Sequence, residues 1–248
     1  MAPPTPIVLS PATPSELLQY ILSHHRYPTT IIIGWPKETF IQGLVEDITL
    51  QHLSLHHNEP EQIQQNKEGE PSNGPSPAHP LERRSLLQTA VSRHIRLLFV
   101  PSTTHLRAYL GTFSASDSQI PPPPPSSELD NSDPRFPTGA PLLLVYGFLD
   151  LHRDGTEWSA QGIGTTTAYF VEAAARNSFR AAIAEPRGAK GFTTLDEFLD
   201  ERVPILSGTG VNMNGEFSGR TVPIRAVLSR WFEFERQDGD EQAKMPSR

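Results

Sequence analysis

Cysteine is absent from this 248-residue sequence, and its absence excludes several kinds of chemistry at once. Disulfides, thiolate-held metals, iron–sulfur clusters and cysteine nucleophiles all need a residue that the chain does not have. Long apolar runs are also lacking, because the longest, Leu142 to Leu149, is far too short to span a bilayer. The segment from Met1 to Pro14 shows no basic stretch followed by an apolar one. We therefore expect a soluble protein that is neither exported by a signal peptide nor bound to a membrane.

The chain also lacks the excess of positive charge that proteins normally use to bind nucleic acid on their own. Its 28 acidic residues outnumber its 21 lysines and arginines, and the formal net charge is −7. Tight binding of DNA by this chain alone is therefore not expected. If it contacts single-stranded DNA, we expect it to do so only within a complex, where a partner supplies the positive charge.

Proline, by contrast, is plentiful, with 25 residues, while apolar residues make up only 36% of the sequence. Such a composition predicts that part of the chain does not fold. Two segments fit this description: 56–80 has almost no apolar residues, and 114–140 contains five consecutive prolines. We predict a single α/β domain over residues 13–236, interrupted by these two disordered linkers, with disordered ends at 1–12 and 237–248.

Outside the linkers, short apolar runs alternate with apolar residues at helical spacing. The runs predict buried strands at Thr29 to Trp35, Ile95 to Val100 and Leu142 to Val145. The helical spacing predicts helices between them, beginning near Leu17, Phe40, Leu86, Leu106 and Thr156. This alternation predicts a mostly parallel sheet with helices on both faces.

The last quarter of the chain reads differently, because its β-type runs cluster without helices between them. Strands are predicted at Val203 to Leu206, Val222 to Leu228 and Trp231 to Phe234. Clustered strands of this kind predict antiparallel strands added at one edge of the parallel sheet. The helix directly before them begins at the capping box Thr194-Leu195-Asp196-Glu197 and ends near Glu201. An earlier helix, from about Thr156 to Asn177, has small residues on its predicted inward face, which would let it lie close to the sheet.

No intact nucleotide-binding motif follows the predicted strands. A phosphate loop needs clustered glycines and a lysine, but Trp35 is followed by Pro36-Lys37-Glu38-Thr39, which contains no glycine. The carboxylate that would hold Mg²⁺ at the end of a central strand is also missing, because Tyr146 stands there. We therefore predict no cofactor and no nucleotide hydrolysis, and we expect a protein that is not an enzyme.

His52, His56 and His57 have a spacing that could hold a metal from one helix. No cysteine completes such a site, and the cluster runs into a polar segment, so surface histidines at a helix end are the preferred interpretation. No metal is predicted. An α/β hydrolase with an unrecognised site stays open as an alternative, although the Gly-x-Ser-x-Gly nucleophile elbow is absent.

Two sets of residues are candidates for contacts with other molecules. Arg187 and Lys190 follow a short predicted strand and are candidate DNA contacts, with a solvated surface as the alternative. Trp231 and Phe232 are neighbours in a predicted strand, so their side chains should point to opposite faces. Because Phe232 shares its face with Phe234, we assign the phenylalanines to the core and Trp231 to a partner. A helix that covers both faces is the alternative.

Three stretches of the chain resemble the RecA-like recombinase fold, in particular its divergent paralogues and the subunits of the Shu complex. Leu142 to Gly147 is similar to the Walker B strand, and Gln161 to Thr165 is similar to the segment that follows it. Val222 to Phe234 is similar to the paired terminal strands. The chain departs from the family where ATP binds, because the Walker A loop is missing and Tyr146 occupies the degenerate Walker B position.

The resemblance implies a RecA-like sheet without ATPase activity that assists homologous recombination and DNA repair through protein–protein contacts. Small paralogues of this kind bind one another or a recombinase and stabilise its filament on single-stranded DNA. The RecA-like accessory subunits of Elongator, which act in tRNA modification, share the degenerate fold and are the alternative. The resemblance also implies a nuclear location, with the cytoplasm as the other option.

Overall fold

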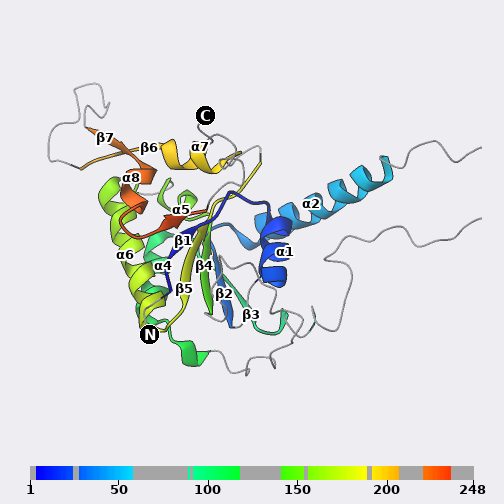
Figure 1. Ribbon diagram of the computed structural model, residues 1–248, viewed down its shortest axis with the longest axis horizontal. Helices are drawn as coiled ribbons and strands as arrows, with labels where there is room; N and C mark the ends of the chain where they lie inside the picture. The colour runs from blue at the N-terminus through cyan, green and yellow to red at the C-terminus, as the bar shows by residue number, and fades with distance from the viewer. Residues whose placement is uncertain are drawn as a thin grey trace, which may run out of the picture.

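The computed structural model describes residues 4–24, 28–57, 89, 92–117, 141–153, 156–188, 192–206 and 220–235. Within these ranges the chain forms a six-stranded sheet with helices on both faces, and the predicted α/β class is confirmed (Figure 1). Most of the predicted linkers 56–80 and 114–140 lies outside the described residues. So do the predicted disordered end at 237–248 and Lys190.

The strand order in the main sheet is β3-β2-β4-β5-β1-β8, and every pairing in it is parallel. The strands are β1 (Ile7–Val8), β2 (Thr29–Ile33), β3 (Ile95–Phe99), β4 (Leu142–Tyr146), β5 (Arg180–Ala184) and β8 (Glu233–Phe234). All residues of β2, β4 and β5 are buried. Burial on both faces explains why these strands read as continuous apolar or β-branched runs.

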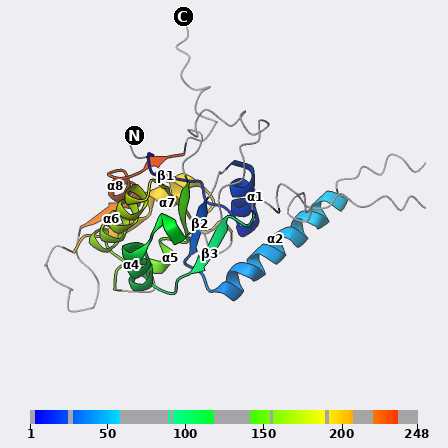
Figure 2. The same cartoon turned by 90° about the horizontal axis from the view of Figure 1, so that it is seen from below.

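Alternate residues of the central strands point to two separate helical layers. Leu142, Leu144 and Tyr146 face α1 (Pro14–His24) and α2 (Lys37–His57). Leu143 and Val145 face the other layer. This second layer contains α4 (Thr103–Thr112), α5 (Asp150–Arg153), α6 (Ala160–Arg176), α7 (Leu195–Asp200) and α8 (Ile224–Leu228). Figure 2 shows α1 and α2 on one side of the sheet and α4 and α6 on the other.

Side chains fix the starts of several helices. Ser159 caps α6 by accepting a 3.0 Å hydrogen bond from the Gly162 amide. Thr194 does the same for α7, where its hydroxyl accepts from the Glu197 amide at 3.2 Å. The Glu197 carboxylate in turn accepts from the Thr193 amide at 2.9 Å. The two caps therefore fix the starts of α6 and α7, and both of these helices pack against α8.

Residues 1–12, predicted to be disordered, are in part an element of the sheet, and that prediction was wrong for its second half. Strand β1 lies between β5 and β8, and Val8 has no exposed surface. The Leu9 amide donates to the Ile183 carbonyl at 2.8 Å, and the Glu235 amide donates to the Val8 carbonyl at 2.9 Å. A two-residue strand is too short to show any period in the sequence, so these distant partners determine it.

The end of the chain also differs from the prediction. The segment predicted as a strand from Val222 to Leu228 is a short strand, β7 (Thr221–Pro223), followed directly by α8. Strand β7 pairs antiparallel with β6 (Arg202–Pro204) in a separate two-stranded sheet. The last strand, β8, pairs parallel with β1, not antiparallel as predicted. Antiparallel strands are thus present, but they lie outside the main sheet.

Helix α2 is less amphipathic than its spacing predicted, because Phe40 is buried while Ile41 and Val45 are largely exposed. Its final turns contain His52, His56 and His57, whose side chains lie outside the described part of the structure. Within that part, no group of histidine and carboxylate side chains could hold a metal ion. None of the described helices is long and apolar enough to cross a lipid bilayer.

Candidate functional site

The carboxyl ends of β2 and β4 are where an open parallel sheet usually binds its ligand, because the chain leaves these neighbouring strands toward opposite faces. Here side chains fill that place. Trp35, just after β2, donates from its indole nitrogen to Asp150 Oδ2 at 2.8 Å. Its ring also packs edge-on against Tyr146, with centroids 5.6 Å apart at an interplanar angle of 72°.

Tyr146, predicted from the sequence to occupy a degenerate Walker B position, is fully buried and serves as a hydrogen-bond donor. Its hydroxyl donates to the Ala12 carbonyl at 2.9 Å and thereby holds the segment before α1 against the sheet. Burial, reinforced by the negative charges of Glu185 and Asp47, raises the pKa of Tyr146. The phenol therefore stays protonated, and its hydroxyl forms an internal structural contact at the carboxyl end of β4.

The loops after β2 and β4 touch through their backbones. A Cβ atom on Gly34 would lie only 2.6 Å from the Gly147 carbonyl oxygen, and Gly147 has a positive φ of 74°. The Gly34 amide donates to the Tyr146 carbonyl at 2.8 Å, so it is not available to a phosphate. These glycines bring two loops together, whereas the glycines of a phosphate loop leave space for an anion.

Glu185 follows β5 at the same edge and is fully buried. Its Oε1 accepts from the Leu149 amide at 2.9 Å, whereas its Oε2 has no hydrogen-bond partner among the described residues. Desolvation, followed by the nearby charge of Asp150, raises the pKa of Glu185 well above its ordinary value. Mg²⁺ prefers charged carboxylate oxygens, and the raised pKa makes Glu185 a weaker candidate for such a ligand.

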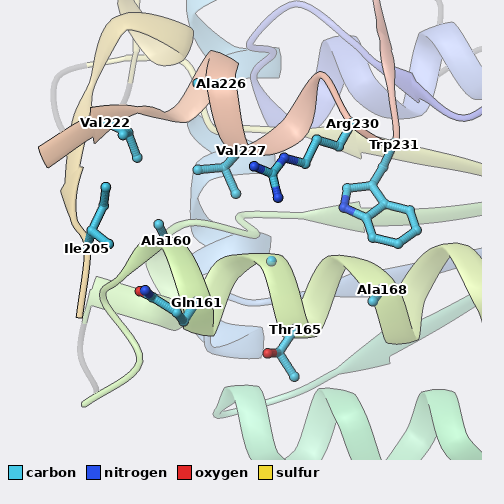
Figure 3. A pocket seen from close by; sticks show the side chains of 11 residues that line it. Ala160, Gln161, Thr165, Ala168, Ile205, Val222, Ala226, Val227, Arg230 and Trp231 are labelled. Carbon is cyan, nitrogen blue, oxygen red and sulfur yellow. The ribbon is translucent and has the colours of Figure 1, made fainter. Parts of the chain in front are cut away.

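A groove of about 540 Å³ lies elsewhere, between α6 and α8 (Figure 3). One wall comes from α6, and the other comes from α8 with the two residues that follow its C-cap. The end of β6 and strand β7 close one end. The lining residues are Ala160, Gln161, Gly164, Thr165, Ala168, Ile205, Val222, Ala226, Val227, Arg230 and Trp231. A Cβ atom on Gly164 would meet nothing within 4 Å, so the α6 wall is open at this position.

The polar groups of this groove are mostly unused by the fold. Gln161 is the exception, since its side chain exchanges two hydrogen bonds with the backbone of Leu206, at 2.9 and 3.3 Å. Across the described ranges, no group accepts a hydrogen bond from the Arg230 guanidinium or from the Trp231 indole nitrogen. Figure 3 shows both pointing over the same stretch of α6. Arg225 differs, because it pairs with Asp196 at 2.6 Å.

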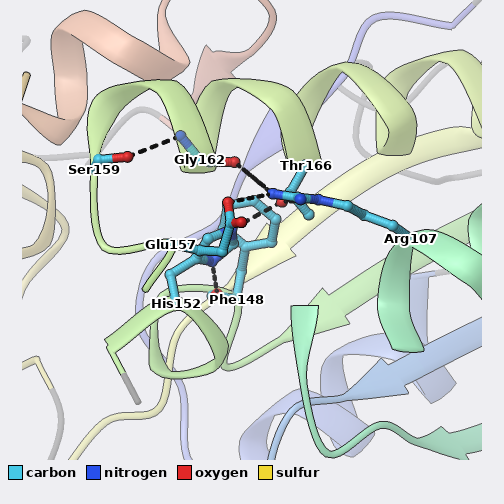
Figure 4. Close-up of polar contacts among 7 residues, drawn as sticks. All are labelled: Arg107, Phe148, His152, Glu157, Ser159, Gly162 and Thr166. Carbon is cyan, nitrogen blue, oxygen red and sulfur yellow. Dashed lines mark hydrogen bonds and ion pairs between the residues drawn. The ribbon is translucent and has the colours of Figure 1, made fainter. Parts of the chain in front are cut away.

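A polar network lies on the inner side of α6 and joins it to α4 and α5 (Figure 4). Arg107 donates to Thr166 Oγ1 at 2.9 Å and to Glu157 Oε2 at 2.8 Å. His152 Nδ1 lies 2.8 Å from the Phe148 carbonyl, which can only accept, so Nδ1 carries the proton. Its Nε2 then accepts from the Thr166 hydroxyl at 3.0 Å.

The Thr166 hydroxyl lies beside His152, and a hydroxyl beside a histidine is the arrangement that a hydrolase uses as nucleophile and base. Both side chains have no exposed surface, so no substrate reaches them. Burial lowers the pKa of His152 to about 4, and the ring is neutral near pH 7. The pair therefore acts here as a packed structural contact between α5 and α6.

The residues predicted to bind other molecules have different surroundings. Trp231 lines the groove with 41% of its surface exposed, while Phe232 is buried and stacks on Phe170 at 6.2 Å. The facing of the two side chains matches the prediction, although Trp231 lies in a turn before β8 and not in a strand. Arg187 forms an ion pair with Glu16, which ties it to α1. Contact with a partner or with DNA stays a prediction for each of them.

Sequence reasoning missed the groove itself. Of the residues expected on the inward face of α6, Ile163, Thr167, Phe170 and Ala174 are buried as predicted, whereas Ala160 and Gly164 line the groove. In the sequence, Arg230 is one of three arginines near the terminal strands, with Arg220 and Arg225, and its charge alone does not distinguish it from the other two. The one available signal was the arginine beside an outward-facing tryptophan.

No protein-family model, curated protein or solved structure matches this chain. The resemblance to RecA-like paralogues therefore rests on the three stretches of sequence quoted above.

Proposed function

We propose that this protein is a non-catalytic accessory factor that works by binding other proteins, in homologous recombination and DNA repair in the nucleus. The observation that carries the proposal is that side chains fill the space at the carboxyl ends of β2 and β4. Trp35, Tyr146 and Asp150 occupy the place where a related ATPase would hold its nucleotide. A sheet filled in this way leaves its outer surfaces for contact with other proteins, which supports a binding role over nucleotide chemistry.

The recombination role comes from the resemblance to divergent recombinase paralogues. Its partners would be a recombinase or other RecA-like paralogues. The charge of the chain supports contact with single-stranded DNA only inside such a complex, because the net charge is −7. Arg187 and Arg225 are engaged in ion pairs within the fold, which leaves less positive charge for phosphates.

The test is affinity purification of the tagged full chain from nuclear extract, followed by mass spectrometry. Recovery of a recombinase and its paralogues is the expected result. Recovery of Elongator subunits would replace the recombination role with one in tRNA modification while keeping the non-catalytic reading. Recovery of neither, together with turnover of an ester or nucleotide substrate, would contradict the proposal as a whole.

A further inference from the structure

The groove between α6 and α8 has the dimensions of a site for a short segment of polypeptide. Ala160, Gly164 and Ala168 follow one another at four-residue intervals along its α6 wall. Eight residues of helix span roughly 12 Å, which is about the length of four residues of extended chain. A folded domain is too large for a groove of this length, whereas a few side chains of a bound segment fill it.

The walls favour an apolar side chain at the centre of that segment. Most of the lining residues are alanine, valine, isoleucine and glycine. Trp231 stands at the opposite end from Ile205 and Val222, as Figure 3 shows. A half-exposed tryptophan beside an apolar groove is the residue type that most often dominates binding between proteins. Covering its ring removes a large apolar surface from water.

The polar groups at the groove favour an acidic residue in the same segment. The guanidinium of Arg230 and the indole nitrogen of Trp231 are donors, and neither has an acceptor within the described ranges. The lining contains no aspartate or glutamate, although acidic residues outnumber basic ones in the chain. A carboxylate satisfies a guanidinium with charge-assisted hydrogen bonds, which are roughly twice as strong as neutral ones.

A nucleic acid strand fits these features less well. Its charge repeats at every phosphate, so proteins that bind it present several cations along the path of the strand. Arg230 is the only charged residue that lines the groove among those described. One cation set among apolar residues matches one carboxylate beside an apolar side chain.

We propose that this groove binds a short segment of a partner protein in which an aspartate or glutamate lies within a few residues of a large apolar side chain. The inference rests on the proposed role in protein binding and adds the site and the chemistry of the segment. Arg230 binds the carboxylate, and the walls between Trp231 and Ile205 hold the apolar side chain.

The first test selects ligands from a display library of random twelve-residue peptides, using the full-length protein and its Arg230→Glu variant. Peptides that bind the wild type should share an acidic residue within about four positions of leucine, phenylalanine or tryptophan. Arg230→Glu should instead select lysine or arginine at that position, because the charge it must match is reversed. The same consensus on both proteins, or no consensus on the wild type, would overturn the proposal.

The second test fills the groove without loosening the fold. Gly164→Leu places a side chain in open space on α6, and Gly111→Leu does the same on α4, away from the groove. Both changes replace a helical glycine, so both variants should melt at or above the wild-type temperature. Gly164→Leu should weaken binding of a fluorescein-labelled selected peptide at least about tenfold, whereas Gly111→Leu should leave it unchanged. Equal affinities for the two variants would sink the assignment to this groove.

Co-purification separates failure of this inference from failure of the proposed function. If Arg230→Glu and Gly164→Leu still recover the wild-type partners, the protein binds them elsewhere and the groove inference is wrong while the function stands. Two further measurements address other occupants. If a twenty-nucleotide oligo(dT) binds saturably and Arg230→Glu abolishes that binding, the groove would be assigned to nucleic acid. Dimers in sedimentation that Gly164→Leu dissociates would assign it to a second copy of the chain. Either result would overturn the proposal.

Discussion

The indole nitrogen of Trp35 and the Asp150 carboxylate are joined by a 2.8 Å hydrogen bond that links the loop after β2 to the start of α5. In an open parallel sheet, the loops after two such neighbouring strands flank the ligand. Here they bind each other, and Tyr146 packs beneath them. Any ligand entering at this edge would first have to break the contact and displace two aromatic rings.

We therefore expect no binding of ATP. Isothermal titration of the full chain with Mg²⁺-ATP should give no saturable heat, because the place for the phosphates is filled and Gly34 already uses its amide within the fold. A dissociation constant for ATP in the micromolar range would contradict the interpretation that side chains fill the space at the carboxyl ends of β2 and β4. The Trp35→Phe variant keeps an aromatic ring but removes the donor, and it should lose about 1 kcal/mol of stability in urea without gaining nucleotide affinity.

The buried ring of His152 should make stability depend on pH. Its pKa is lowered to about 4 in the folded protein and is 6.5 when unperturbed, so in acid the unfolded state takes up a proton that the folded state resists. Stability from this group is complete above pH 6.5 and is lost as the pH falls toward 4. The full effect is roughly 3 kcal/mol. Urea unfolding from pH 4 to 8 would measure it.

The control for this prediction is His152→Gln, which cannot titrate. It should be less stable than the wild type at pH 7, because it disturbs the contacts with Phe148 and Thr166. The difference should shrink as the pH falls below 6.5. A difference that stays constant down to pH 4 would show that burial does not lower the histidine pKa.

Glu185 should act in the opposite direction. Its folded pKa is raised above the ordinary 4.5, so its contribution to stability is complete below that pH and is lost as the pH rises. Glu185→Gln resembles the neutral acid and can keep the bond from the Leu149 amide. The variant should be more stable than the wild type at pH 7 and equal to it near pH 4. Thermal unfolding at both pH values tests this, and a less stable Gln variant at pH 7 would refute it.

Two glycines of α6 should respond oppositely to alanine. A Cβ atom on Gly162 would lie 2.3 Å from the Glu157 carbonyl oxygen, whereas one on Gly164 would meet nothing within 4 Å. Gly162→Ala should therefore lose about 1–3 kcal/mol of stability through overpacking. Gly164→Ala should gain up to about 1 kcal/mol from helix propensity. Urea midpoints for the pair would measure both, and equal shifts would mean that the turn at Glu157 yields easily.

Trp231→Ala should reduce partner recovery without unfolding the protein. The side chain is 41% exposed, so its removal leaves no internal cavity, and the melting temperature should stay within about 2 °C of the wild type. Phe232→Ala is the contrast, because Phe232 is buried against Phe170 and its loss should cost about 3–5 kcal/mol. If Trp231→Ala unfolds the protein, Trp231 belongs to the core and not to an interface.

The central strands could be predicted because their local sequence and their final surroundings agree. Residues 29–33 and 142–146 are buried on both faces, and a uniformly apolar or β-branched run is the direct consequence. The capping box of Thr194 and Glu197 was readable for the same reason, since its contacts are local.

The elements that sequence reasoning missed depend on distant partners. Strand β1 has two residues, and only its pairing with β5 and β8 makes it a strand. Strand β8 lies within a segment predicted to be a strand, but its parallel pairing with β1 was missed. Helix α8 begins directly after Pro223, and its apolar sequence suits a strand equally well until it packs on α6. Predicting the groove would have required both the helix α8 and the outward orientation of Gly164 on α6, because the walls of the groove come from α6 and α8.

The position of β1 has a consequence for how the protein folds during synthesis. Ile7 and Val8 leave the ribosome long before Ala182 and Ile183, their partners on one side, and Glu233 and Phe234, their partners on the other. Strand β1 therefore leaves the ribosome unpaired, and it stays unpaired until most of the chain has been translated. Contacts so distant in sequence are slow to form, and an unpaired edge is open to association with other chains. We expect nascent chains that end before residue 233 to need a chaperone over this edge.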